Sequence, residues 1–231
     1  MVHSWLDYAA ARWSVAALLL LGMLICIDAA FIAIHLVYAY TPWLADPMYS
    51  VETDRGYPEL FQYIKLAWII LLCLVLAARH RGLTYLAWAA TFGALLGDDV
   101  FSLHERYGSR LVKAWSLEPM LGLRAVDIGE MLVLGVLGLA VLVVLAVAYV
   151  RADAPGRRFT HRVVGLLFVL AFFGVVVDAA GSLFRETALG LVLHTAEDAG
   201  EMLLVSVILW TVFTSTETSL ARPAPAALPV R

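Results

Sequence analysis

The sequence predicts an all-α protein: a polytopic membrane protein built as a bundle of six transmembrane helices. Two observations come from composition. Of the 231 residues, 62% are hydrophobic and only 15% are charged, whereas a soluble domain carries about 25% charged residues; the mean hydropathy is +0.86. The third observation is a series of six apolar runs, each near the ~20 residues that cross a bilayer as a helix.

Each apolar run is too long and too continuous for a barrel strand, so a helix is expected in every case. The expected helices cover about 14–38, 60–78, 84–103, 126–150, 163–184 and 190–214. The first run exceeds the ~7–15 residues of a signal-peptide core and contains Asp28 and His35, so it is expected to span the bilayer. Residues 1–213 then form a single membrane domain, and the Pro- and Ala-containing segment 214–231 is expected to be a disordered cytoplasmic tail.

The segments between the runs are charged or rich in turn-forming residues. ARHRG at 78–82 and RADAPGRR at 151–158 are short, basic and on the same side as both termini. Short basic loops stay on the cytoplasmic side, which places both termini in the cytoplasm and the protein in a bacterial inner membrane. The longest connection, HERYGSRLVKAWSLEPM at 104–120, has the composition of an amphipathic surface helix, or of a lid.

Acidic and other polar residues gather at the opposite, periplasmic ends of all six helices, spaced three, four or seven apart. The residues in these stripes are Asp28, His35, Glu59, Asp98, Ser102, Glu105, Asp127, Glu130, Asp178, Arg185, His194, Glu197, Asp198 and Glu201. Lys65 and His104 lie near them but off the regular helix faces, and Asp99 lies about 100° around the helix from Asp98, so it is expected to point to a second partner. Spacings of three, four or seven keep residues on one helix face, and intramembrane ionisable groups usually face the bundle interior. The stripes therefore predict a single intramembrane cavity.

Carboxylates in a low dielectric stay ionised only beside cations, and a bound metal is the strongest such partner. The expected ligands are His194, Glu197, Asp198, Asp98, Asp127, Glu130, His35 and Asp28. Mixed imidazole and carboxylate ligands suit Zn²⁺, Mn²⁺ or Fe²⁺, whereas an all-oxygen subset would suit Ca²⁺. Around them we expect Asp178, Arg185, Glu105, His104, Lys65 and Glu59, and Lys65 can neutralise one acid.

Several of these residues also have plain structural interpretations. Glu59, Glu105 and Asp127 lie near helix ends, where an acid can sit at the membrane interface or favour the helix dipole. Asp178 and Arg185 can form an ion pair across two turns. Trp residues near the span ends need no role beyond that of interface anchors.

Two classes of function remain open. The first is a metal-dependent hydrolase acting on a lipid or other apolar substrate, with Glu201 as general base and Ser102 as orienting donor. The second is a cation or proton transporter or sensor that uses the same carboxylates; a non-catalytic accessory membrane subunit is a further alternative. The composition and the net charge of −3 argue against a soluble enzyme and a nucleic-acid-binding protein. Two isolated cysteines argue against a disulfide framework.

Three strings, GYPELFQYIK (56–65), GDDVFSLHERYG (97–108) and EDAGEM (197–202), resemble a family of small bacterial six-span membrane proteins without an assigned activity. A partial resemblance to the ceramidase-like membrane hydrolases rests on Ser102, His104 and His194. That resemblance implies zinc held by histidines and cleavage of a lipid amide. The chain departs from it with six helices instead of seven, and with Asp198 where an H-x-x-x-H motif would place its second histidine. A three-histidine site would require His35, His104 and His194 to converge.

Overall fold

The structure is a computed structural model, and it describes residues 13–120, 122–184 and 186–221. Its regular elements within these ranges are all helical, which confirms the predicted all-α class. They are α2 (Val15–Tyr40), the 3₁₀ turn η1 (Pro47–Tyr49), α3 (Tyr57–His80), α4 (Leu83–Phe101), α5 (Leu103–Trp115), α6 (Ala125–Val150), α7 (Ala154–Ala171), the π-helical segment η2 (Phe172–Val177), α8 (Asp178–Leu183) and α9 (Ala188–Leu220).

The long helices have the length and composition of membrane spans. In the described ranges five candidates are found: α2, α3, α6, the continuous rod α7–η2–α8, and α9. The bent pair of α4 and α5 makes a sixth if it counts as one span. Large apolar side chains point outward on these helices; Val136 is 71% exposed and Phe168 67%. Such a surface needs lipid around it, so several long apolar helices indicate a membrane protein, with a span count of five or six.

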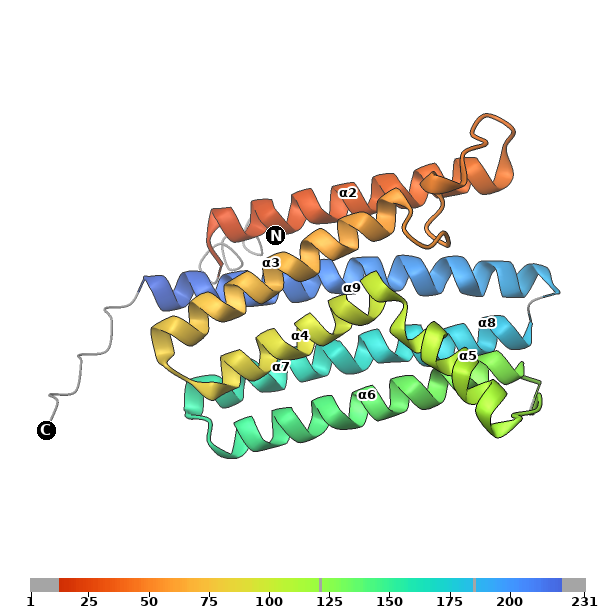
Figure 1. Cartoon of the computed structure of the whole chain (residues 1–231). Coiled ribbons are helices and arrows are strands. Elements are labelled where there is room, and N and C mark those ends of the chain that lie inside the picture. Colours follow the sequence, from red (N-terminus) through yellow and green to blue (C-terminus); the bar gives the residue numbers. More distant parts are fainter. Residues whose placement is uncertain (1–12, 121, 185, 222–231) are drawn as a thin grey trace, which may run out of the picture.

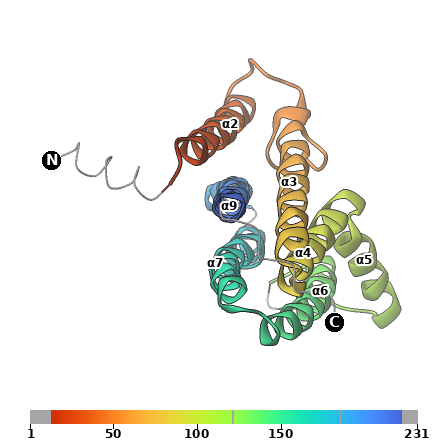
Figure 2. The ribbon, with the colours of Figure 1, turned by 90° about the vertical axis from the view of Figure 1, so that its left-hand side faces the viewer.

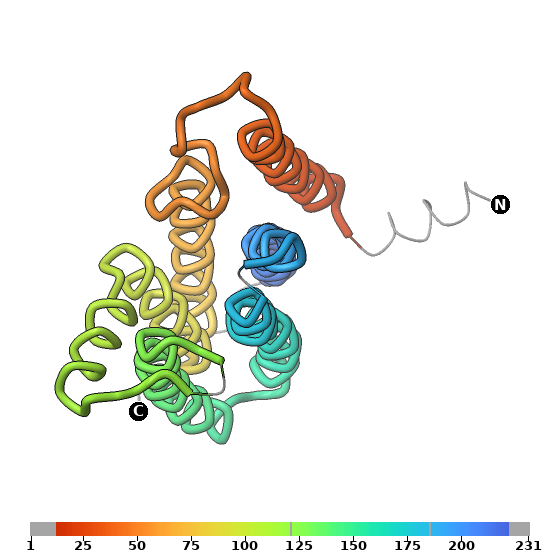
Figure 3. Tube along the Cα trace, turned by 90° about the vertical axis from the view of Figure 1, so that its right-hand side faces the viewer, coloured from red at the N-terminus to blue at the C-terminus, as the bar shows by residue number. Residues whose placement is uncertain are grey.

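The helices run side by side, with α9 in the middle (Figures 1 and 2). α9 contacts α2, α3, α7, η2 and α8, whereas α4 contacts both α3 and α6. The turns 80–84 and 150–154 lie at one end of the bundle with the start of α2 and the finish of α9; we call this the basic end. The loop 41–56, α5, α8 and the start of α9 lie at the other end, the acidic end (Figures 1 and 3).

The buried apolar core occupies the half of the bundle nearer the basic end. Ile69, Trp88, Phe92, Val163 and Ile208 are all completely buried there, contributed by α3, α4, α7 and α9. Trp88 also donates its indole N–H to Thr160 Oγ1 at 3.1 Å, so its polar atom is satisfied inside the core. Polar groups toward the acidic end are therefore separated from the basic end by close-packed apolar side chains.

The fourth element differs from the prediction of an unbroken helix at 84–103. α4 ends at Phe101, and α5 leaves it at an angle of 67°. Ser102 forms the corner with φ 47° and ψ 50°, in the left-handed region. Asp98 stabilises the corner because its carboxylate accepts hydrogen bonds from the backbone N–H of His104 and from His104 Nδ1, both at 2.9 Å.

The amphipathic segment that follows the corner is helical, but it contacts another helix instead of only the surface. α5 lies against α6, and two glycines permit the contact. A Cβ on Gly129 would lie 2.5 Å from the backbone oxygen of Gly108, and one on Gly108 would lie 2.7 Å from the backbone nitrogen of Glu130. Only glycine allows the two backbones to come this close.

The fifth span starts earlier than the predicted residue 163. Asp153 caps α7 by accepting a hydrogen bond from the Gly156 N–H at 2.8 Å, and Pro155 suits the first turn. The charged residues of that turn interrupt the apolar pattern, so the pattern alone did not predict a helix there. The rod then continues through the π-helical segment η2 into α8 (Figure 1).

The predicted start of a disordered tail at residue 214 is wrong, because α9 continues through Leu220. Ser and Thr side chains in this stretch hydrogen-bond to the preceding turn, as when Thr216 Oγ1 donates to Val212 O at 2.9 Å. The last turn is also held by α3, since Arg79 Nε donates to Ser219 O at 2.9 Å. Residues 222–231 of the predicted tail lie outside the described residues.

Candidate functional site

Three side chains at the acidic end come close enough to share one metal ion. Asp178 of α8 and His194 and Glu197 of α9 each offer a ligand atom, and these atoms all lie within 4.8 Å of one another. His194 Nδ1 and Glu197 Oε2 are 3.9 Å apart. One imidazole nitrogen and two carboxylate oxygens suit Zn²⁺, Mn²⁺ or Fe²⁺. Within residues 13–120, 122–184 and 186–221, no other group of three such side chains meets this distance.

Local structure explains how these three side chains meet. His194 and Glu197 are three residues apart on α9, so they share a face. Asp178 is the first residue of α8, directly after the π-helical turn. A π-helical insertion changes the rotational setting of everything that follows it, and such insertions are frequent at functional sites.

Two glycines of the same rod leave the space that the α9 side chains fill. A Cβ on Gly181 would lie 2.9 Å from His194 Cε1 and 3.0 Å from Nδ1. A Cβ on Gly174, inside the π-helical segment, would collide with Glu201 Oε1. The absence of a Cβ at these two positions therefore leaves room for the side chains of His194 and Glu201.

Beside the triad lies a small cavity of about 140 Å³, which we call the acidic pocket. Six carboxylates from four parts of the fold line it: Glu52, Asp54, Glu59, Asp99, Asp198 and Glu201. No Lys or Arg is among its lining residues in the described part of the chain. Gln62 also lines the pocket, and its buried Oε1 has no hydrogen-bond partner among the described residues. Most of the polar side-chain atoms that line the pocket are thus oxygens.

Met202 also lines the acidic pocket, and its backbone oxygen contacts a buried ion pair. Lys65 Nζ donates to Asp28 Oδ1 at 2.9 Å, to Met202 O at 2.8 Å and to Ser206 Oγ at 3.2 Å. Ser206 Oγ donates in turn to Asp28 Oδ2. Asp28, predicted from the sequence as a metal ligand, instead pairs with Lys65, and the pair joins α2, α3 and α9.

His35 is likewise engaged away from the triad. Its Nδ1 lies 3.1 Å from Ser50 Oγ, and its Nε2 lies 3.3 Å from Thr195 Oγ1 and 3.7 Å from Glu52 Oε1. His35 is 1% exposed, and both of its ring nitrogens have hydrogen-bond partners. The side chain therefore connects α2 with the loop 41–56 and with α9.

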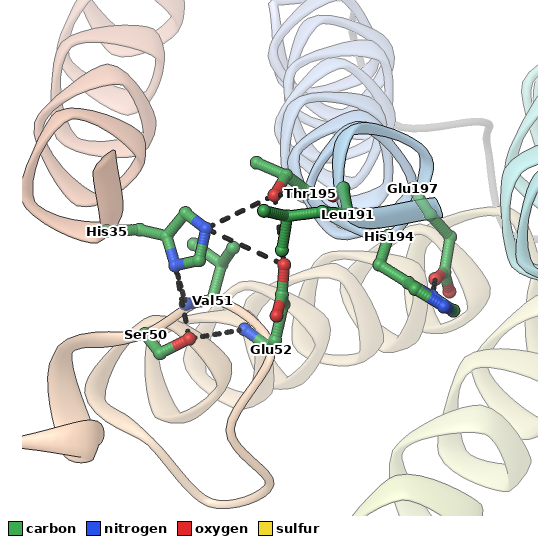
Figure 4. Close-up of polar contacts among 8 residues, drawn as sticks. All are labelled: His35, Ser50, Val51, Glu52, Leu191, His194, Thr195 and Glu197. Carbon is green, nitrogen blue, oxygen red and sulfur yellow. Dashed lines mark hydrogen bonds and ion pairs between the residues drawn. The ribbon is translucent and has the colours of Figure 1, made fainter. Parts of the chain in front are cut away.

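Figure 4 shows why His35 and His194 do not converge. His35 reaches α9 on the side of Thr195, whereas His194 and Glu197 project from the other side of the same helix. His104, the third histidine of the predicted set, is paired with Asp98 at the α4–α5 corner. The three-histidine arrangement is therefore not formed.

Asp127 has a local partner at the start of α6. The Arg124 backbone N–H donates to Asp127 Oδ2 at 3.0 Å, and Arg124 Nη2 donates to Oδ1 at 2.6 Å. The hydrogen bonds that the Arg124 guanidinium donates to the Asp127 carboxylate raise the pKa of that guanidinium above its ordinary value. Asp127 thus serves the helix terminus, as the alternative interpretation expected.

The structure brings part of the predicted set together and separates the rest. Glu59, Asp198 and Glu201 line the acidic pocket, while His194 and Glu197 join Asp178 in the triad. Glu105 and Glu130 are half-buried near the α5–α6 contact, and Ser102 forms the corner without a side-chain hydrogen bond to any described residue. Arg185 lies outside the described residues.

Sequence reasoning missed Glu52, Asp54 and Asp99 as pocket residues. Glu52 and Asp54 lie in a loop, where helical spacing offers no signal. Helical spacing points Asp99 away from the predicted cavity, because it lies about 100° around the helix from Asp98. In the structure Asp98 stabilises the α4–α5 corner, and Asp99 lines the acidic pocket. The paired glycines Gly174 and Gly181, seven residues apart, were a signal available in the sequence.

Comparison with known proteins identifies a family but no activity. A family described as "Domain of unknown function (DUF8692)" matches residues 17–216. No curated protein and no solved structure matches the chain, and the comparisons show no likeness to ceramidase-like hydrolases. The matched range overlaps every candidate span and includes all residues of the triad and the acidic pocket. The chain belongs to the DUF8692 family.

Proposed function

We propose that this chain is an integral membrane protein that binds a divalent cation, Zn²⁺, Mn²⁺ or Fe²⁺, at Asp178, His194 and Glu197. One observation carries the proposal: the ligand atoms of these three residues lie within 4.8 Å of one another, on two packed helices. Three protein ligands leave coordination positions open, which is the arrangement of catalytic metal sites more than of structural ones.

The surroundings of the triad support a cation as the ligand. Six carboxylates line the neighbouring acidic pocket, and Asp198 directly follows Glu197 in α9. A cleft lined by one sign of charge, with low-dielectric walls, raises the local concentration of the opposite ion. The acidic pocket therefore acts as the approach to the triad for a cation arriving from the acidic end.

The interior of the bundle favours binding over permeation. Behind the pocket lie the Lys65–Asp28 pair and then the apolar core around Ile69 and Ile208. A fixed buried ammonium repels a second cation, and apolar side chains offer it no ligands. This observation counts against the alternative of a cation channel or transporter through the bundle.

The proposal includes an orientation. The basic end, with both described chain ends and the turns at 80–84 and 150–154, faces the cytoplasm, and the acidic end faces the periplasm of a bacterial inner membrane. In this arrangement α4 with α5 supplies the sixth crossing, since an even number of crossings puts both ends on one side.

A second candidate is metal-dependent hydrolysis of a lipid or other apolar substrate, and the position of Glu201 favours it. Glu201 lies one helical turn after Glu197 and fits against Gly174. A bound metal would polarise a carbonyl or phosphoryl oxygen and activate water. Glu201 would hold the proton taken from that water, as general base.

The proposal is tested by metal content. Full-length protein is purified in a mild detergent, incubated with Zn²⁺, Mn²⁺ or Fe²⁺, and analysed by inductively coupled plasma mass spectrometry. We expect about one ion per chain, lost in His194→Ala and in the isosteric Glu197→Gln. The control is His161→Ala, which removes an exposed histidine of α7 at the opposite half of the bundle.

Size-exclusion elution separates loss of the site from loss of the fold. A variant that elutes as the wild type does, without metal, supports the site. Full metal content in both folded variants, or no ion in the wild type with any of the three metals, overturns the proposal.

A further inference from the structure

A second cavity, larger than the acidic pocket, lies at the basic end, and nothing in the proposed function uses it. It has a volume of about 500 Å³ and opens between the last turns of α3 and α9 and the first turns of α4 and α7. Figure 2 views the bundle from this end and shows these four helices grouped around one region.

Its charge is opposite to that of the acidic pocket. Three guanidinium groups line it, from Arg79, Arg158 and Arg162, together with His80. Ser and Thr side chains of α9, between residues 214 and 219, add polar hydroxyl oxygens, and those of residues 214, 215 and 218 donate to backbone oxygens of the same helix. No carboxylate is among its lining residues in the described part of the chain. The lining therefore carries a charge of +3 with His80 neutral.

One wall of the cavity is held rigidly. Arg79 Nε donates to Ser219 O at 2.9 Å, and His80 Nε2 lies 2.7 Å from Ser219 Oγ. These contacts join α3 to α9. Arg158 and Arg162 face them from α7, four residues apart and so on one helix face, and both side chains are exposed.

The remaining lining is apolar and aromatic. Leu76 and Phe159 are buried members of the core, and Tyr85 and Trp13 complete the wall. Trp and Tyr are enriched at the level of lipid headgroups, and the cavity lies at the ends of candidate spans. A ligand here meets guanidinium donors on one side and apolar side chains on the other.

We propose that this cavity binds the phosphate of an anionic membrane lipid such as phosphatidylglycerol. Guanidinium groups bind phosphate oxygens through paired, charge-assisted hydrogen bonds. Basic pockets between spanning helices at a membrane face suit anionic headgroups. A soluble phosphate shares the same chemistry, but it would leave Leu76 and Phe159 unused, so a lipid fits the lining better.

The experiment is native mass spectrometry of the full-length protein, delipidated in a neutral detergent and titrated with phosphatidylglycerol or phosphatidylcholine. We expect phosphatidylglycerol to bind about tenfold more tightly, because phosphatidylcholine presents the same phosphate beside a quaternary ammonium group that the three guanidinium groups repel. Arg158→Gln and Arg162→Gln should each remove most of this preference. Because both side chains are exposed, the substitutions leave the fold intact.

The matched control is Arg151→Gln, an exposed arginine of the same turn region that does not line the cavity. It should keep the preference. Equal binding of the two lipids by the wild type, or equal loss in the control, overturns the proposal. Full competition by millimolar inorganic phosphate would also overturn it, by assigning the cavity to a soluble anion. The outcome is independent of metal binding at the triad.

Discussion

Lys65 Nζ lies 2.9 Å from Asp28 Oδ1, and neither side chain is exposed at all. Each charge is satisfied by the other and by α9, through Met202 O and Ser206 Oγ. The pair joins α2, α3 and α9 at the point where the acidic pocket gives way to the apolar core. A closed network of this kind holds three helices in one rotational setting.

Breaking this pair from one side is expected to destabilise the bundle strongly. Lys65→Met leaves Asp28 buried without a cation, at a cost of about 3–5 kcal/mol, whereas Lys65→Met with Asp28→Leu removes both charges and recovers most of the loss. This order of stability is checked by heating each variant in detergent and measuring the fraction of protein that stays monodisperse. If the double variant is no more stable than the single one, the prediction is wrong, because the loss does not come from the unpaired charge of Asp28.

The glycine facing His194 is expected to control metal binding. Gly181→Ala places a Cβ 2.9 Å from His194 Cε1, so the imidazole must rotate away from Asp178 and Glu197. We expect metal affinity to fall about tenfold or more, because a misplaced ligand weakens the site. Isothermal titration with Zn²⁺ measures the change. Gly165→Ala is the control on the same rod, since its Cβ would meet nothing within 4 Å; equal affinities in both variants contradict the prediction.

The contact between α5 and α6 is expected to depend on backbone proximity at Gly129. Gly129→Ala drives a Cβ to 2.5 Å from the Gly108 oxygen and to 3.0 Å from Val112 Cγ2. Backbone cannot yield as a side chain does, so α5 should separate from α6. Hydrogen exchange of the α5 amides measures this and should rise sharply. Gly135→Ala, further along α6 and open on its outer side, should leave the exchange unchanged.

The corner residue Ser102 offers a way to separate strain from chemistry. Its left-handed backbone (φ 47°) is easier for glycine, so Ser102→Gly should be neutral or stabilising by up to about 1 kcal/mol. The thermal midpoint checks stability. If lipid hydrolysis is found and Ser102→Gly abolishes it while the midpoint holds, the predicted orienting role of the hydroxyl is supported; unchanged turnover rejects that role.

The proposed orientation is expected to appear in cysteine labelling. On a background of Cys26→Ala and Cys73→Ala, Trp43→Cys places a thiol in the exposed loop at the acidic end, and Arg157→Cys places one at the basic end. A membrane-impermeant maleimide applied to intact cells should label only Trp43→Cys. Labelling of Arg157→Cys alone would mean the reverse orientation, and labelling of both would mean an even number of crossings between them.

Much of the secondary structure followed from the sequence, because it depends on local properties. Long apolar runs must form helices wherever water cannot satisfy the backbone, and the predicted helix starts near 14, 126 and 190 fall within two residues of those observed. Boundaries failed where local hydrogen bonds extended a helix into polar sequence, as at Asp153 and in the serine- and threonine-rich end of α9.

The sequence predicted at which end of the bundle the candidate site lies, but not which residues form it. Alternating helix directions put the polar stripes at one end, and helical spacing put His194 with Glu197 on one face. Which stripes meet depends on how each helix is rotated about its own axis. That rotation is set by the Ser102 corner, by the π-helical turn before Asp178 and by the glycines that admit close contacts.

The sequence by itself therefore determined the helical class, the apolar surface and the gathering of acids at one end, since each follows from composition and spacing along one chain. Only the tertiary structure decided that Asp28 belongs to Lys65, that His35 belongs to the loop, and that Asp178 meets His194 and Glu197. The physical reason is that a side chain's partner across helices depends on packing between segments far apart in sequence, which no local pattern encodes.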